Sequence, residues 1–118
     1  MTEHDSLLDL TERIREFSRE RDWEKFHDPK SLILALIGEV GELAELFQWI
    51  PADSALEHFA DEKRQQRAAE EISDVLIYLL RLADVLGIDV GPEAHAKLSD
   101  SARRFEASSV HGTAPEKN

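Results

Sequence analysis

The chain has 118 residues, with 25 Asp and Glu against 14 Lys and Arg, and its formal net charge is -11. The length suits one domain, and the excess of acid argues against sequence-independent binding to nucleic acid or an anionic membrane, because both need positive charge facing phosphates. The absence of cysteine excludes disulfides and thiolate zinc sites, and no apolar run reaches the roughly 18 residues of a membrane span, so we expect a cytoplasmic protein.

The first predicted helix covers about residues 5 to 20. Apolar residues recur there at helical spacing, at Leu7, Leu10, Ile14 and Phe17. The polar segment that follows interrupts this pattern and predicts a loop.

A second helix is expected to begin after Asp28, which resembles an N-cap, with Pro29 at the first helical position. Its apolar pattern runs from Leu32 to Ile50 and stops at a proline. A polar connector that has room for one short helical turn is predicted over residues 51 to 61.

A long third helix is predicted to end at Gly87, and a shorter fourth helix to run from Pro92 to about Phe105. Residues 107–118 show no periodicity and are expected to form a disordered tail. There is no internal repeat, no β-type alternation and no glycine-rich phosphate loop. The pattern predicts an all-α four-helix bundle over residues 1–106.

Two acidic pairs border the apolar faces of the second and third helices. At about 100° per residue, Glu39 falls inside the apolar arc and Glu42 at its border, while Glu71 and Asp74 flank the apolar face of the third helix. Buried ionised carboxylates are costly, and four near one another repel. A divalent cation such as Mg²⁺, which prefers oxygen ligands, would resolve this repulsion. The two pairs therefore predict a metal site.

Each pair alone also has ordinary explanations. Acids three residues apart are common on solvated helices, and Arg67, four residues before Glu71, is a candidate surface partner. A di-iron site would use Glu-x-x-His on two helices, and that spacing occurs once, at Glu24 and His27. An acidic helical module that binds a basic partner stays open as a non-enzymatic alternative.

The run Glu39-Val40-Gly41-Glu42, followed by Glu70-Glu71-Ile72-Ser73-Asp74, resembles the ExxE…ExxD signature of the MazG-like all-α nucleoside triphosphate pyrophosphohydrolases. The similarity covers residues 5 to 106. Within the family it is closest to the dCTP pyrophosphatases, through ERDWEKFHDPKSLILALIGEVGELAELFQW and EEISDVLIYLLRLADVLGID.

The resemblance implies hydrolysis of a nucleoside triphosphate to the monophosphate and pyrophosphate, in the service of nucleotide-pool cleansing. The expected substrate is dCTP or a modified dCTP, with dUTP or another non-canonical nucleotide as the alternative. It also implies Mg²⁺, replaceable by Mn²⁺, held by four catalytic carboxylates: Glu39, Glu42, Glu71 and Asp74. We expect these acids to hold a water that attacks the α-phosphorus, with Glu42 as the candidate water-orienting base.

Aromatic and basic residues supply the candidate substrate contacts. The resemblance places a base pocket at Trp23, Phe26, His27, Trp49 and Tyr78, and flat aromatic faces are suited to stacking on bases. Three cations are candidate phosphate contacts: Lys30, Lys97 and Arg104. Three positions depart from the dCTP-type pattern: Ser101 and Glu106 replace an asparagine and a proline, and Ile14 replaces a histidine.

Apolar surface beyond one small core predicts self-association. Such surface is expected at Leu34, Ile37, Leu76 and Leu80. The resemblance implies a dimer or tetramer, and the dCTP-type similarity favours a homotetramer with pockets completed across subunits.

Overall fold

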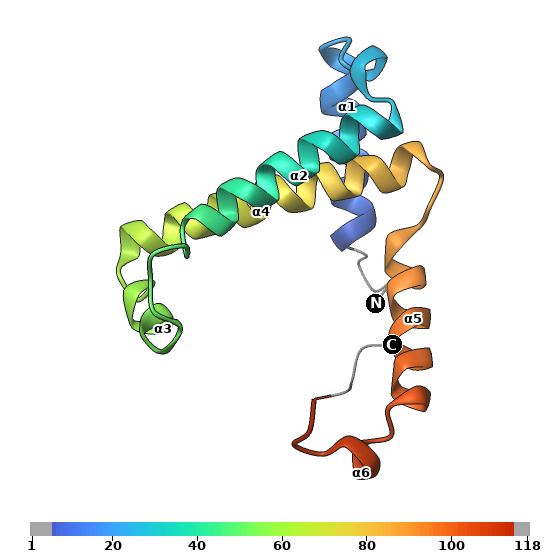
Figure 1. Cartoon of the computed structure of the whole chain (residues 1–118). Coiled ribbons are helices and arrows are strands. Elements are labelled where there is room, and N and C mark those ends of the chain that lie inside the picture. The colour runs from blue at the N-terminus through green and yellow to red at the C-terminus, as the bar shows by residue number, and fades with distance from the viewer. Residues whose placement is uncertain (1–5, 115–118) are drawn as a thin grey trace, which may run out of the picture.

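The computed structural model describes residues 6–114, and every regular element in that range is helical (Figure 1). The predicted all-α class is therefore confirmed. The first residue of the expected N-terminal helix and the last four residues of the expected tail lie outside the described range. No helix within it is long and apolar enough to cross a membrane.

An antiparallel pair of helices, α2 (Pro29–Glu45) and α4 (Glu62–Val85), forms the centre of the structure (Figure 1). Leu32 and Leu36 of α2 and Leu80 of α4 are buried in the core. The expectation that Leu80 would remain uncovered is wrong, because α4 packs against both α2 and α1 (Ser6–Glu20) and Leu80 is only 1% exposed. Leu34 and Ile37 are exposed, as predicted.

The starts of the two central helices are fixed by aspartate caps. Asp28 accepts hydrogen bonds from the backbone N–H of Ser31 at 2.9 Å and from its hydroxyl at 2.7 Å, and Asp61 accepts from the backbone N–H of Arg64 at 3.1 Å. Each cap satisfies an amide that has no partner inside its helix. At the other end of α4, Gly87 adopts φ 72, a left-handed conformation that glycine reaches without strain.

The second helix is shorter than predicted. It ends at Glu45 rather than Ile50, and the chain tightens into three-residue turns, with the amide of Phe47 bonding the carbonyl of Ala44. These turns bring the Phe47 ring to 4.7 Å from that of Phe59. The connector contains η2 (Ala52–Ser54) and α3 (Ala55–His58), so the expected short helical turn is present.

The C-terminal helices lie away from the central pair. Helix α5 (Val90–Arg104) starts two residues before the predicted Pro92 and turns away from α2 and α4 (Figure 1). None of its residues is buried. A short helix, α6 (Ala107–Val110), occupies part of the predicted unstructured tail. The division of the chain at residue 106 remains a prediction.

An ion-pair network joins α1 to α4. Arg15 donates to both carboxylate oxygens of Asp84, from Nε at 2.9 Å and from Nη2 at 2.6 Å. Arg81 donates to the same carboxylate from Nη1 at 3.1 Å. Bidentate arginine–carboxylate pairs combine charge with fixed geometry, so this network holds the two helices in register.

Replacing Asp84 with Asn tests this connection. The pKa of Asp84 is lowered, chiefly by the hydrogen bond from Arg15. Its stabilisation is therefore present above the unfolded-state pKa of about 3.9 and is lost as pH falls through the lower folded-state value. We expect the variant to lose about 1–3 kcal/mol of unfolding free energy at pH 7, and its difference from wild type to shrink below about pH 4. Urea denaturation at both pH values measures this difference.

Asp100→Asn is the matched control. Asp100 forms pairs with Arg103 at 3.5 Å and Arg104 at 3.4 Å, and all three side chains are about half exposed or more. Exposed pairs contribute little, so the control should change stability by less than about 0.5 kcal/mol. Equal losses in the two aspartate variants would contradict a specific role for Asp84.

Candidate functional site

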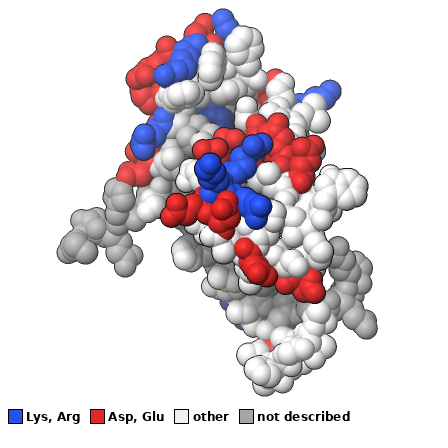
Figure 2. Space-filling view, turned by 90° about the vertical axis from the view of Figure 1, so that its left-hand side faces the viewer, with Lys and Arg blue, Asp and Glu red and all other residues white. Residues whose placement is uncertain are grey.

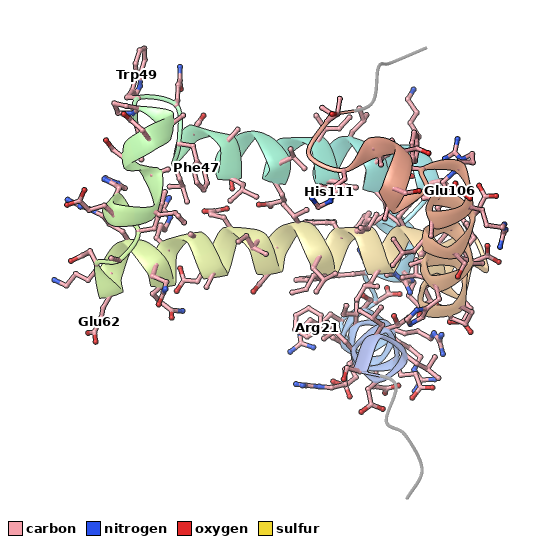
Figure 3. The ribbon with its side chains drawn as sticks, turned by 90° about the horizontal axis from the view of Figure 1, so that it is seen from below. Arg21, Phe47, Trp49, Glu62, Glu106 and His111 are labelled. Atoms are coloured by element: carbon pink, nitrogen blue, oxygen red, sulfur yellow. The ribbon has the colours of Figure 1, made fainter. Side chains whose placement is uncertain are left out.

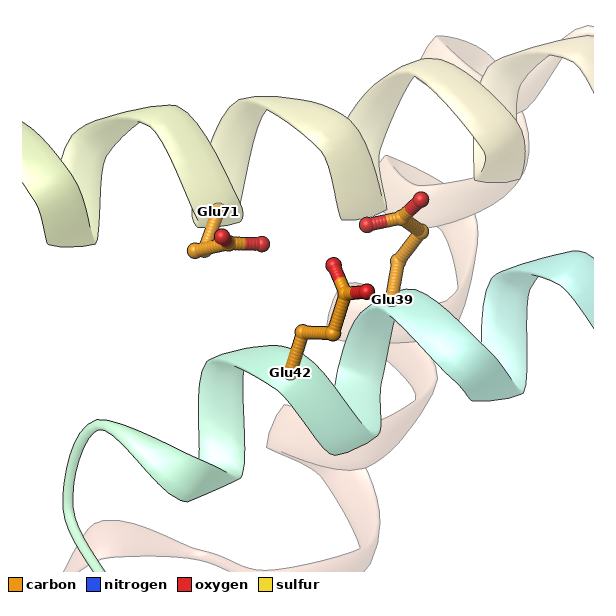
Figure 4. Close-up of side chains that lie close together, drawn as sticks. All are labelled: Glu39, Glu42 and Glu71. Carbon is orange, nitrogen blue, oxygen red and sulfur yellow. The ribbon is translucent and has the colours of Figure 1, made fainter.

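Three carboxylates meet between α2 and α4. Glu39 and Glu42 project from α2 and Glu71 from the facing side of α4 (Figure 4). One oxygen from each of the three lies within 4.8 Å of the others. Glu71 is buried, Glu39 is half-buried and Glu42 is exposed. The cluster is thus open on one side and enclosed on the other.

Helical spacing explains why acids occupy this interface. Glu39 follows the buried Leu32 by seven residues and the buried Leu36 by three, so it lies on the same face of α2. Glu71 follows the buried Ala68 by three residues on α4. Both glutamates therefore occupy positions that would otherwise hold core residues.

Two of the carboxylate oxygens are left without hydrogen bonds. Among the described residues, Oε2 of Glu39 and Oε2 of Glu71 are buried and have no hydrogen-bond partner. The pKa of Glu39 is raised by burial, by the neighbouring carboxylate of Glu42, and by the negative charges of Asp74 and Glu71. A proton or a cation would relieve this unfavourable arrangement.

Asp74 lies close to the cluster but outside the group of three. Its charge contributes to the raised pKa of Glu39, yet its carboxylate does not belong to the set of converging oxygens. Aspartate is one methylene shorter than glutamate, so it reaches less far from α4. The structure therefore brings together three of the four predicted metal ligands and leaves Asp74 at the rim.

The surface pairing considered for Glu71 is also present. Arg67 donates from Nε to Oε1 of Glu71 at 3.4 Å. The Arg67 side chain is 62% exposed, and it bonds only one of the two Glu71 oxygens. The inner oxygen of Glu71 still lacks a partner.

A cavity of about 400 Å³ lies one helical turn away from the acids. It is lined by Trp23, Phe26, His27, Ser31, Leu32, Ala35 and Tyr78. Four of the five predicted base-pocket residues therefore line this cavity. Ala35 precedes Glu39 by four residues and Tyr78 follows Asp74 by four, so the cavity and the acids share the same faces of α2 and α4.

The smaller lining residues carry no sequence signal of their own. Ser31 and Ala35 have no aromatic ring or charge to mark them, and Leu32 was identified only as an apolar residue. Their one signal was position, because they lie on the face of α2 that also carries Glu39.

Arg81 is a further residue that the sequence did not single out as functional. It is only 7% exposed, and its Nε donates to Nδ1 of His27 at 2.9 Å. The pKa of His27 is lowered, first by burial and then by the charge of Arg81, while Glu24 opposes the shift. His27 is therefore neutral near pH 7.

The other predicted substrate residues lie outside the cavity. Trp49 is 86% exposed and points outward, at the end of the helix pair far from α1 (Figure 3). Lys97 and Arg104 are on the exposed α5, where Arg104 pairs with Asp100 at 3.4 Å. Lys30 is exposed in the first turn of α2, next to the cavity-lining Ser31. None of the four lines the cavity within this chain.

The charged surface is mixed rather than basic. On the face seen in Figure 2, Lys and Arg side chains are interspersed with Asp and Glu. That face presents no continuous positive patch of the kind that follows a nucleic-acid backbone.

Comparison with known proteins gives consistent results. dCTP pyrophosphatase 1 from Bos taurus is 41% identical over 109 residues, which are 92% of this chain and 64% of that protein. The Homo sapiens protein is 43% identical over 102 residues, which are 86% of this chain and 60% of that protein. The chain thus spans less than two thirds of these relatives.

A solved structure is similar over nearly its whole length. The crystal structure of a pyrophosphatase from Archaeoglobus fulgidus aligns with a TM-score of 0.79 and 37% identity, covering 90% of this chain and 97% of that chain. The MazG-like family model matches residues 37–116, which include all four predicted acids. Because this match covers more than half of the sequence, the chain belongs to the MazG-like family.

Proposed function

We propose that this protein is a Mg²⁺-dependent nucleoside triphosphate pyrophosphohydrolase. It converts a deoxynucleoside triphosphate and water to the monophosphate and pyrophosphate, with dCTP or a modified dCTP as substrate. The observation that carries the proposal is the convergence of Glu39, Glu42 and Glu71 one turn from an aromatic cavity. The similarity to dCTP pyrophosphatases supports the choice of substrate.

The donor set is suited to a hard divalent cation. Carboxylate oxygens are the ligands that Mg²⁺ prefers, and the buried Oε2 atoms of Glu39 and Glu71 have lone pairs that no described residue uses. Glu39, Glu42 and Glu71 would hold the ion, and Asp74, which lies at the rim of the cluster, is the candidate fourth ligand. When bound, Mg²⁺ neutralises negative charge that develops on the leaving pyrophosphate.

The protein's own side chains bind the base, accept the proton of the attacking water and neutralise a phosphate oxygen. Trp23, Phe26 and Tyr78 hold the base, which fixes the α-phosphate relative to the acids. Glu42, the exposed member of the cluster, accepts a proton from the attacking water at a carboxylate oxygen. The water oxygen forms a bond to the α-phosphorus. At the same time the bond between the α-phosphorus and the oxygen that bridges it to the β-phosphorus breaks, and pyrophosphate leaves. Lys30, in the first turn of α2, neutralises a phosphate oxygen.

We further propose that a homo-oligomer, most simply a tetramer, completes the site. Helix α5 carries Lys97 and Arg104 away from the cavity, and Trp49 is almost fully exposed. Leu34 and Ile37 expose apolar surface on α2, and Leu98 exposes it on α5. A second copy that covers these residues would bring its cations to the triphosphate and close a four-helix bundle.

A melting experiment tests the metal site without reference to catalysis. We expect Mg²⁺ to raise the Tm of the wild type, because a ligand specific to the folded state stabilises it. Glu39→Gln should lose this rise and, without metal, should be at least as stable as wild type, since it removes a buried charge that has no partner. Glu45→Gln, an exposed acid on the same helix, is the control and should respond to Mg²⁺ like wild type.

Pyrophosphate release tests the reaction. With Mg²⁺ and dCTP, Glu39→Gln should lose activity by on the order of 100-fold or more, while Glu45→Gln keeps wild-type turnover. Unchanged turnover in Glu39→Gln would falsify the assignment of the acids.

A panel of dCTP, 5-methyl-dCTP, dUTP and dTTP tests the base preference. We expect the highest kcat/KM for the cytosine nucleotides. If dUTP is the only nucleotide hydrolysed, the proposed reaction stands and the proposed cytosine substrate is wrong. If no nucleotide is hydrolysed and Mg²⁺ leaves the Tm unchanged, the chain is instead an interaction module.

A further inference from the structure

We propose that Arg81 is a positioning residue that fixes His27 as the Nε2–H tautomer, so that His27 offers a hydrogen-bond donor to an acceptor atom on the nucleobase. This inference rests on the proposed function, because it assigns the base to the cavity lined by Trp23, His27 and Tyr78. It adds to that function a residue that determines which edge of the base is recognised.

The chemistry of arginine dictates the tautomer. The guanidinium is always protonated in proteins and has no acceptor, so Nε of Arg81 can only donate. Its partner Nδ1 of His27, at 2.9 Å, must therefore present a lone pair. In a neutral imidazole the proton then lies on Nε2.

The packing leaves Nε2 for a ligand. Arg81 lines a small cavity of about 100 Å³ behind the base pocket, and His27, Trp23 and Tyr78 line both cavities. The Nδ1 edge of His27 is occupied by Arg81. No residue in the described part of the chain bonds Nε2, so the base is the partner that the larger cavity can supply.

Arg81 is itself held in place. It is buried, and its Nη1 donates to Asp84 at 3.1 Å. Asp84 is fixed in turn by the bidentate pair with Arg15. The charged groups that act on His27 are Arg81 from α4 and Glu24 from η1 (Glu24–Phe26), and burial and Arg81 together outweigh Glu24 in favouring the neutral ring.

The tautomer defines the ligand that suits the pocket. An Nε2–H donor requires a ring nitrogen or a carbonyl oxygen on the base, and the pyrimidine edge of cytosine supplies both. Without Arg81 the ring could place its proton on Nδ1 and turn a lone pair toward the same atoms, which would repel them. Arg81 therefore decides whether His27 donates or accepts the hydrogen bond to the base, although Arg81 itself does not contact the substrate.

Nitrogen-15 NMR of the imidazole tests the tautomer directly. Five histidines are present in the chain, and a His27→Gln variant assigns the His27 signals. In wild type we expect a neutral Nε2–H form at pH 7. A protonated ring or an Nδ1–H tautomer in wild type would overturn the proposal without any need for an Arg81 variant.

Arg81→Met tests the cause. The variant keeps an unbranched side chain and leaves the pair between Arg15 and Asp84 intact. We expect a mixture of tautomers and a His27 pKa that moves up toward the ordinary value of about 6.5. Arg81→Lys retains the positive charge and a hydrogen-bond donor, so it should restore part of the Nε2–H signal of His27 seen in wild type. Arg103→Met on the exposed α5 is the matched control and should leave His27 unchanged.

Binding and kinetics test the link to the base. Adding dCMP to wild type should shift the Nε2 signal more than the Nδ1 signal. Arg81→Met should raise KM for dCTP about tenfold with a smaller change in kcat, and Arg81→Lys should recover part of the loss. A lost tautomer with unchanged KM would overturn the proposed recognition of the base. If wild type hydrolyses no nucleotide but retains the Nε2–H form, the proposed function fails and the control of His27 by Arg81 stands.

Discussion

Electrostatic repulsion between α2 and α4 is the constraint on which the rest of the site depends. Glu39 and Glu71 occupy positions of a helix interface where apolar residues would give greater stability, and each has a buried oxygen without a partner. The fold tolerates this arrangement because Leu32, Leu36 and Leu80 form a separate apolar contact along the same helix pair. The aspartate caps fix where each helix begins, and the packing of α2 against α4 holds the acids near one another.

Much of this arrangement could be predicted from the sequence. Periodicity and capping residues predict the long helices, and the wheel position of Glu39 predicts an acid on the core-facing side of α2. The end of α2 could not be predicted, because the apolar pattern continues to Ile50 whereas the helix ends at Glu45 and the turns that follow bring Phe47 against Phe59. A long-range contact of this kind leaves no local signal.

Prediction from the sequence was limited in the same way within the site. Spacing alone placed Asp74 beside Glu71 but could not show that its shorter side chain stays outside the cluster. The sequence did not mark Arg81 as functional, whereas the fold buries it against His27. The approach of a loop residue to a helix 54 positions later in the chain is decided by tertiary packing.

The acids and part of the cavity wall lie on one helix pair, and for the proposed enzyme this has an evolutionary consequence. In the proposed function, the acids and the cavity residues of α2 and α4 share one helix interface, so the spacing between them is set by that interface. If the cavity holds the base, exchange of lining side chains such as Ser31 or Ala35 would change the nucleotide that fits without moving the helices. Lineages with this frame should therefore diversify in the nucleotides they accept while their catalytic chemistry stays the same.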